Sequence, residues 1–186
     1  MAGHSKWKQI KHKKAANDKE RGKIFSKLSK LITIAVVEGG GMTDPNLNLK
    51  LRLAIDKARE SNMPKDNIQR AIEKGSGPDK NNLKEVIYEG YGPQGVALVV
   101  HATTDNSNRT FNEVRSVVER AGGKLGTQGS VAYLFQVTHS PELEYTPLFN
   151  MEIADRAVSD TILGILEQLE ELDDVQQVFT NAVFPD

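Results

Sequence analysis

The side chains with the clearest chemical capability lie at the start of the chain, where bases are frequent and acids are rare. The first thirty residues hold ten Lys or Arg against the two acids Asp18 and Glu20. Ammonium groups at this density bind phosphates and displace their counterions, and a nearby aromatic ring offers a face on which a base can stack. We therefore predict that nucleic acid is contacted by Lys6, Trp7, Lys8, Lys11, His12, Lys13, Lys14, Lys19, Arg21 and Lys23.

A run of charge is often only a solvated surface, so the balance of the whole chain matters. The segment from His139 to Asp186 carries eleven acids against the single base Arg156, and the net charge of the chain is -1. Such a separation would draw a polyanion to one end and repel it from the other. The charge pattern therefore favours a nucleic-acid partner over a merely solubilising tail.

The kind of base indicates which nucleic acid is bound. From Lys6 to Lys27 there are eight Lys and only one Arg. Lys acts as a point charge, whereas bidentate reading of guanine most often uses Arg. The joint from Gly39 to Pro45 is also longer than the turn of a helix-turn-helix motif. We expect backbone contact with ribosomal RNA, and a sequence-selective DNA regulator stays open as the alternative because Lys-rich arms bind DNA as well.

A second polar cluster runs from Asp105 to Thr110, between an expected strand and an expected helix. An Asn or Asp at this point caps a helix, which explains one of these residues but does not require Arg109. Loops beside a rigid sheet commonly carry function. We therefore add Asn108 and Arg109 to the predicted nucleic-acid contacts.

Several features that suggest catalysis fail on their context. The stretch from Gly90 to Gly95 matches the glycine spacing of dinucleotide sites, but a strand follows it where that motif needs a helix. The four His are scattered, and no nucleophile, base and orienting group occur at a meaningful spacing. We expect no enzyme, no catalytic residue, no metal, no cofactor and no small-molecule substrate. A metal-dependent enzyme is the disfavoured alternative.

Composition points to a protein of the cytoplasm. The chain has no Cys, which suits a reducing compartment. Its longest apolar run, Leu31 to Val37, is far shorter than the ~20 residues of a membrane span. Residues 6–21 are polar where a secretory signal would be apolar. We expect no membrane partner.

The first half of the chain is predicted to be an extended arm, residues 1–17, followed by a helical bundle over residues 18–77. The apolar residues recur at helical spacing in three stretches: from about Asp18 to Gly39, from about Asn46 to Ser61, and from Pro64 to Gly75. Such short helices are unstable alone, so their apolar faces must pack together.

Residues 78–186 are predicted to form an α+β domain. Strands are expected at Val86–Tyr91 and Val96–Thr103, joined by a turn, then at 131–135, 148–153 and 175–179. Helices are expected over about Thr110–Ala121 and Asp155–Leu172. Together these elements suggest β-α-β-β-α-β, a ferredoxin-like sandwich with an antiparallel sheet and an extra leading strand.

Several motifs in the chain are similar to those of the YebC/PmpR family, which includes the mitochondrial translational activator of cytochrome c oxidase. They occur in the family's order over most of the chain: Ala2 to Trp7, Lys13 to Phe25, Tyr88 to Pro93, Asp105 to Thr110, and Gly122 to Phe135. The resemblance implies a non-enzymatic cytoplasmic factor in gene expression. Members act as DNA-binding transcriptional regulators or as ribosome-associated translation factors, and we expect the second activity here.

One departure from the family pattern concerns its third domain. Full-length members carry a further small α/β domain after the stretch that matches Phe135. In this chain residues 136–147 replace it and lead almost directly to the last helix and strand. The resemblance therefore implies a helical domain and a middle domain whose two halves are contiguous.

Overall fold

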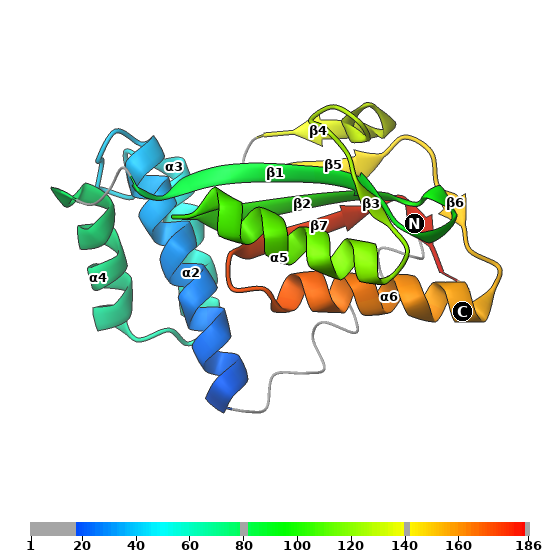
Figure 1. The fold of residues 1–186 in the computed structure, drawn as a ribbon. Coiled ribbons are helices and arrows are strands. Elements are labelled where there is room, and N and C mark those ends of the chain that lie inside the picture. The colour runs from blue at the N-terminus through cyan, green and yellow to red at the C-terminus, as the bar shows by residue number, and fades with distance from the viewer. Residues whose placement is uncertain (1–17, 79–81, 140–141, 185–186) are drawn as a thin grey trace.

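The structure is a computed structural model that describes residues 18–78, 82–139 and 142–184 (Figure 1). The helical part contains α2 (Asp18–Glu38), α3 (Leu49–Glu60) and α4 (Lys65–Ser76). Asn48 caps α3 by accepting a hydrogen bond from the Leu51 amide, and Pro64 stands at the N-cap of α4. The expected helices are thus confirmed with small shifts of their ends.

The apolar faces of these helices form one core. Its fully buried members are Ile32, Ala35, Val36, Leu51, Ala54, Ile55, Ala58, Met63, Ile68, Ala71 and Ile72. The helix α4 continues through Gly75, where a Cβ atom would lie 2.6 Å from Val36 Cβ. Glycine therefore permits the close approach of α4 to α2, and Thr33 Oγ1 donates to the Ala71 carbonyl across the same contact.

The second part is built on a four-stranded antiparallel sheet. Its strands are β1 (Lys84–Tyr91), β2 (Ala97–Thr104), β3 (Lys124–Leu125) and β7 (Val175–Thr180), in the order β3-β1-β2-β7. The short turn η2 (Pro93–Gly95) joins β1 to β2, with Gln94 and Gly95 at positive φ. The glycine pattern at Gly90–Gly95 is therefore a hairpin turn, as expected.

Helices cover one face of the sheet and a hairpin covers part of the other (Figure 1). The helices α5 (Ser107–Arg120) and α6 (Arg156–Glu171) pack side by side on one face, where Leu98, Val100, Val114 and Ile162 belong to the core. The hairpin of β4 (Phe135–Thr138) and β5 (Glu144–Pro147) lies on the opposite face. The mixed α+β fold predicted from the sequence is confirmed.

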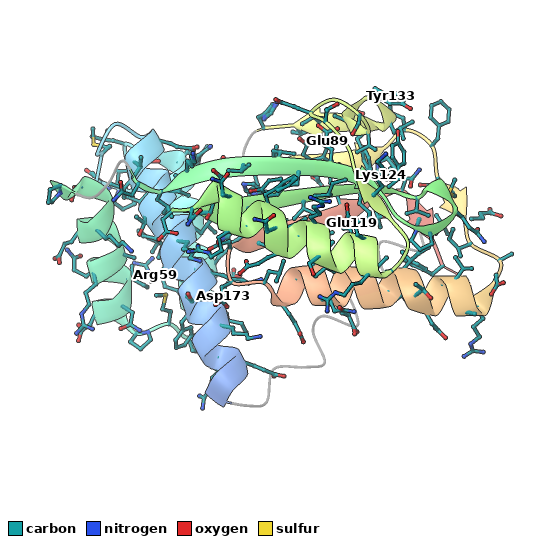
Figure 2. The ribbon with its side chains drawn as sticks, in the orientation of Figure 1. Arg59, Glu89, Glu119, Lys124, Tyr133 and Asp173 are labelled. Carbon is teal, nitrogen blue, oxygen red and sulfur yellow. The ribbon has the colours of Figure 1, made fainter. Side chains whose placement is uncertain are left out.

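Two predicted strands differ from the structure. The stretch 131–135 contains the 3-10 turn η3 (Ala132–Leu134), and β4 begins only at Phe135. The buried Glu89 carboxylate accepts hydrogen bonds from the amides of Gly129, Val131 and Ala132, so these groups are unavailable to a strand ladder. Figure 2 shows Glu89 and Tyr133 on the hairpin side of the sheet.

The other difference concerns the expected strand at 148–153. Only β6 (Met151–Glu152) forms there, and it pairs in parallel with β8 (Ala182–Val183) outside the main sheet. The leading strand β1 takes the place beside β2 that the third strand of a ferredoxin-like sheet would occupy. Its long register with β2, from Lys84 opposite Thr104 to Tyr91 opposite Ala97, leaves no room there for a later strand.

Candidate nucleic-acid interface

A hollow of about 530 Å³ lies where α2, α5 and the end of α6 meet. It is lined by Lys23, Lys30, Arg109, Glu113, Glu171, Leu172, Asp173 and Asp174. Lys23 and Arg109 come from two separate predicted contact regions of the sequence, and the fold brings them to the same hollow. The tertiary structure therefore joins part of the basic helix to the loop before α5.

The buried carboxylate of Asp174 organises this hollow. Its side chain is only 3% exposed, and its Oδ1 accepts from Lys30 Nζ at 2.5 Å. Its Oδ2 accepts from Arg109 Nη2 at 2.7 Å, from Thr110 Oγ1 at 2.6 Å and from Thr104 Oγ1 at 3.0 Å. A buried charge needs such pairing, because an unpaired one is costly to remove from water.

These contacts set the protonation of Asp174. Burial alone would raise the pKa of this carboxyl, but the hydrogen bonds from Lys30, Thr110 and Arg109 hold the pKa well below its usual range. The Asp174 and Asp105 carboxylates in turn raise the pKa of the Arg109 guanidinium. The group is therefore a charged network at neutral pH, and it joins α2 to β2 and α5.

The loop before α5 is ordered by its own cap. Asn106 stands at the N-cap and accepts a hydrogen bond from the Arg109 amide, and the Asn106 amide donates to Thr104 Oγ1. The Arg109 side chain is 46% exposed and uses Nη2 for both Asp105 and Asp174. Its Nη1 and Nε atoms make no hydrogen bond to the described residues, so they are available to a phosphate.

The basic and acidic parts of the chain are not at opposite ends of the molecule. Lys27 Nζ donates to the Glu170 carbonyl, and Lys30 Nζ donates to the Asp173 carbonyl at 3.0 Å. Figure 2 shows Asp173 beside α2, near the end of α6. The expected spatial separation of charge was therefore wrong for α2, because the acidic turn after α6 folds against it and neutralises part of it.

The structure places the remaining predicted contacts as follows. Lys6, Trp7, Lys8, Lys11, His12, Lys13 and Lys14 lie outside the described residues, and Lys19 lies in α2 with its side chain outside the description. Arg21 and Asn108 are exposed, and Lys23 is half-buried at the hollow. Within the described parts of the chain, Lys23 forms no hydrogen bond or ion pair.

Sequence reasoning did not connect Lys30, Thr104 and Asp174 with the polar cluster that runs from Asp105 to Thr110. The signal for Asp174 was an acid placed between the apolar Leu172 and the buried Val175. An acid in that position is buried with partners, but the partners lie up to 144 residues away. Periodicity along the chain could not identify them.

Among residues 18–78, 82–139 and 142–184 there is no group of three or more His, Cys, Asp or Glu placed to hold a metal ion. Within those ranges, too, no helix has the length and apolar character needed to cross a membrane.

Comparison with protein-family models gives two matches along the chain. Residues 5–78 match the TACO1/YebC protein N-terminal domain, and residues 83–139 match the TACO1/YebC second and third domain. The second match ends at residue 139, within residues 136–147, which are predicted to replace the third domain.

Individual relatives agree with these matches. A probable transcriptional regulatory protein of Geobacter sulfurreducens is 46% identical over all of this chain and 78% of its own length. One from Halothermothrix orenii is 38% identical over all of this chain and 96% of its own, in an alignment of 246 positions. Because this chain has 186 residues, the longer alignment reflects residues that it lacks.

A solved structure supports the fold. A conserved hypothetical protein of Aquifex aeolicus superposes with a TM-score of 0.85 and is 36% identical. The likeness covers 95% of this chain and 96% of the Aquifex chain. The helical part and the α+β part are therefore both present in a protein of known structure.

Proposed function

The chain belongs to the TACO1/YebC family and lacks most of the third domain, and from this we propose that it is a nucleic-acid-binding regulator of gene expression that acts on ribosomal RNA. The observation that carries the proposal is the meeting of Lys23 and Arg109 at one hollow. The helix that bears Lys23 begins at Asp18, directly after the cationic segment 1–17. The predicted phosphate contacts are thus continuous from the start of the chain to the loop before α5.

We propose that the segment 1–17 supplies most of the affinity and that the hollow sets the orientation. Lys30 and Arg109 already share the Asp174 carboxylate, so their net attraction for phosphate is reduced. Lys23 and the outer nitrogens of Arg109 remain as donors. This arrangement suits contact with a phosphate backbone, because point charges and a single guanidinium edge read little base sequence.

A sequence-selective DNA regulator is the second candidate, and the printed names of the relatives favour it, since these are probable transcriptional regulatory proteins. The helices argue against docking in a DNA groove. The exposed face of α4 mixes Lys65 and Arg70 with Asp66 and Glu73, so a groove lined by phosphates would repel part of it. In addition, α4 packs closely on α2 at Gly75, so the main partner of each of these two helices is the other rather than α3.

We propose that this activity is non-enzymatic and cytoplasmic and that it involves the ribosome without a membrane or cofactor. We also propose three domains of function: the arm at 1–17, a bundle at 18–77 and an α+β domain at 78–186, with residues 136–147 in place of the third family domain. The separate hydrophobic cores of the helices and the sheet support the last boundary.

Cosedimentation with ribosomes, beside a binding assay with promoter DNA at the same salt, tests the proposal. The full chain should sediment with ribosomes and protect no discrete DNA site. Contact with six or more phosphates should lower the affinity by roughly a thousandfold between 50 and 200 mM salt. A version begun at Asp18 should lose most of the binding. A discrete DNA footprint without ribosome binding would contradict the proposal in favour of the second candidate.

A point variant tests the hollow. Lys23→Gln should weaken ribosome binding severalfold, because it removes the donor that has no acid partner. Lys74→Gln on the exposed surface of α4 is the matched control and should bind like the original chain. Equal loss in both variants would mean that only total charge matters.

A further inference from the structure

A second cleft, of about 630 Å³, lies between α2 and α3 on one side and the sheet with its β4–β5 hairpin on the other. Its volume lies within the range of ordinary ligand pockets. Apolar side chains line its helical wall, among them Leu28 and Leu31 of α2, and Leu143 and Tyr145 line the hairpin side. The Asp174 hollow shares none of these residues.

The floor of the cleft is a row of polar groups on the sheet. Ile87 of β1 pairs with His101 of β2, and His101 pairs with Gln177 of β7, so the three side chains share one face. Glu85 lies two residues before Ile87 on the same face. All four residues line the cleft, at strand spacings of about 4.8 Å. A carboxylate, an imidazole and an amide are thus presented together.

The imidazole of His101 has no hydrogen bond to the described residues, although its side chain is only 5% exposed. Glu85 Oε1 lies 3.4 Å from Nε2, an ion-pair distance that is long for a hydrogen bond, so Nδ1 is the ring nitrogen without any polar partner among the described residues. A buried polar group without a partner is costly, and such a group is rare in folded proteins. His101 therefore marks this floor as a place for a ligand with hydrogen-bonding atoms.

The hydrogen-bonding groups on the floor of the cleft determine which ligand fits. A carboxylate only accepts hydrogen bonds, so the group opposite Glu85 must donate them. Guanine has two adjacent donors, N1–H and the N2 amino group, beside the acceptor O6. A neutral imidazole or an amide supplies the donor for O6, and the apolar walls suit the faces of a planar ring. Interaction with His101 and Lys50, which outweighs burial, lowers the pKa of Glu85 and keeps it an acceptor.

We propose that this cleft binds one unstacked guanine base, with Glu85 accepting from N1–H and the N2 amino group and with His101 and Gln177 facing O6. The sugar and phosphate would lie at the open rim, where Lys50 and Lys57 form ion pairs with Glu38 and Glu142. The base can belong to an RNA strand or to a free nucleotide. Binding of a base in an RNA strand rests on the proposed function. It gives the regulator a site that recognises a base, whereas its phosphate contacts recognise only the backbone.

Calorimetric titration of the full chain tests the site, with guanosine 5′-monophosphate as the probe and the adenosine, cytidine and uridine monophosphates as controls. The guanine nucleotide should bind at least about tenfold more tightly than the others. Inosine 5′-monophosphate, which lacks the N2 amino group, should bind about tenfold more weakly than the guanine nucleotide. This comparison needs no variant and so does not depend on how a variant folds.

Two variants test whether the guanine nucleotide binds at the floor of the cleft. Glu85→Gln places an amide donor against the guanine donors, and His101→Leu removes the donor to O6, so each should weaken binding about tenfold. Glu144→Gln is the matched control, because Glu144 is exposed on β5 and does not line the cleft. Unfolding midpoints measured for all three exclude a general loss of structure. Equal binding of the four nucleotides, or guanine binding that both variants retain, would overturn the proposal.

A single-stranded oligouridine with one central guanosine separates this inference from the proposed function. If the oligonucleotide binds but replacing guanosine by inosine changes nothing, the guanine site is refuted and nucleic-acid binding stands. If the oligonucleotide fails to bind while the mononucleotide binds selectively, the guanine site stands for free nucleotides and the proposed function fails.

Discussion

Two polar clusters lie where α2 meets the α+β part, and they differ in how their hydrogen bonds are satisfied. At the first, Asp174 receives hydrogen bonds from Lys30, Arg109, Thr104 and Thr110. At the second, His101 is buried to nearly the same extent, yet neither ring nitrogen has a hydrogen bond to the described residues, and Nε2 lies only at ion-pair distance, 3.4 Å, from Glu85 Oε1. Asp174 and His101 are therefore buried to a similar extent, but only Asp174 has its hydrogen bonds satisfied.

The difference separates a structural role from a binding role. The donors to Asp174 come from three elements, so the carboxylate holds α2 against β2 and α5 in one arrangement. Around His101 a cleft separates the helices from the sheet and hairpin, and contacts such as the Lys57–Glu142 ion pair, at 2.8 Å, and the Gln176–Lys27 hydrogen bond cross it. A satisfied network fixes geometry, whereas unsatisfied groups facing a cleft are ready to bind.

The largest expected effect comes from breaking the satisfied cluster. Asp174→Asn removes the charge that accepts from Lys30 and Arg109, and because each hydrogen bond to a charged group contributes roughly 1.5–3 kcal/mol, the variant should lose about 3 kcal/mol. Urea unfolding should show this fall in the free energy of unfolding. Asp160→Asn, on the exposed face of α6, is the control and should change it by less than about 0.5 kcal/mol. A small effect at Asp174 would mean that the cluster does not hold the fold.

A smaller effect is expected from removing one donor. Lys30→Met keeps the length of the side chain but leaves Asp174 Oδ1 without the lysine, and hydrogen bonds to charged groups contribute roughly 1.5–3 kcal/mol. The free energy of unfolding should fall by about that amount. Lys74→Met on α4 should leave it nearly unchanged. Because Lys30 joins α2 to the turn after α6, hydrogen exchange should also rise at this contact.

Lowering the pH from 4 to 3 should reduce the contribution of Asp174 to the free energy of unfolding by about 1 kcal/mol. The pKa of Asp174 is lower in the folded chain than its ordinary value of about 3.9, so the stabilisation is complete above that pH and is lost as the pH falls below it. Urea midpoints of the original chain and of Asp174→Asn at pH 7, 4 and 3 measure it. The gap between the two proteins should narrow with acid, and a constant gap would contradict the assignment.

The smallest effect on the free energy of unfolding is expected at His101. There a substitution should stabilise the fold slightly rather than destabilise it. His101→Leu replaces a buried polar group without a hydrogen bond by an apolar one of similar volume, so the free energy of unfolding should stay equal or rise by up to about 1 kcal/mol. His139→Leu, at an exposed position, serves as the control. A loss above 1 kcal/mol would show that the imidazole has a partner in solution and would remove the contrast between the clusters.

Local signals were sufficient for most elements of the fold. Asn48, Asn106 and Asp155 cap α3, α5 and α6 through side-chain oxygens, and such caps depend on residues only a few positions apart. The strand at 131–135 was predicted wrongly because its amides are bonded to Glu89, about 42 residues earlier. The pattern of residues within 131–135 gives no indication of such a distant partner.

The candidate sites also contain features that the sequence could predict and features that it could not. The cationic character of residues 6–23 and the loop with Arg109 could be predicted, and both stay predictions as contact sites. That Lys23 and Arg109 line one hollow, and that Asp173 and Asp174 face α2, could not be predicted from patterning. The sequence analysis noted His101 only as one of four scattered His, and the sheet register is what places it, without a hydrogen bond to the described residues, beside Glu85 and Gln177.

The sequence by itself determined the family, the helices and the strands β1, β2 and β7, because capping, periodicity and motif spacing are short-range properties of the chain. Tertiary structure alone decided which charges are neutralised and which polar groups stay unpaired. Lys30 and Asp174 are 144 residues apart, and their separation in space depends on how α2 packs against the sheet. Pairing energies fall steeply with distance, so the packing of distant segments decides whether a charged side chain stabilises the fold or remains available to a ligand.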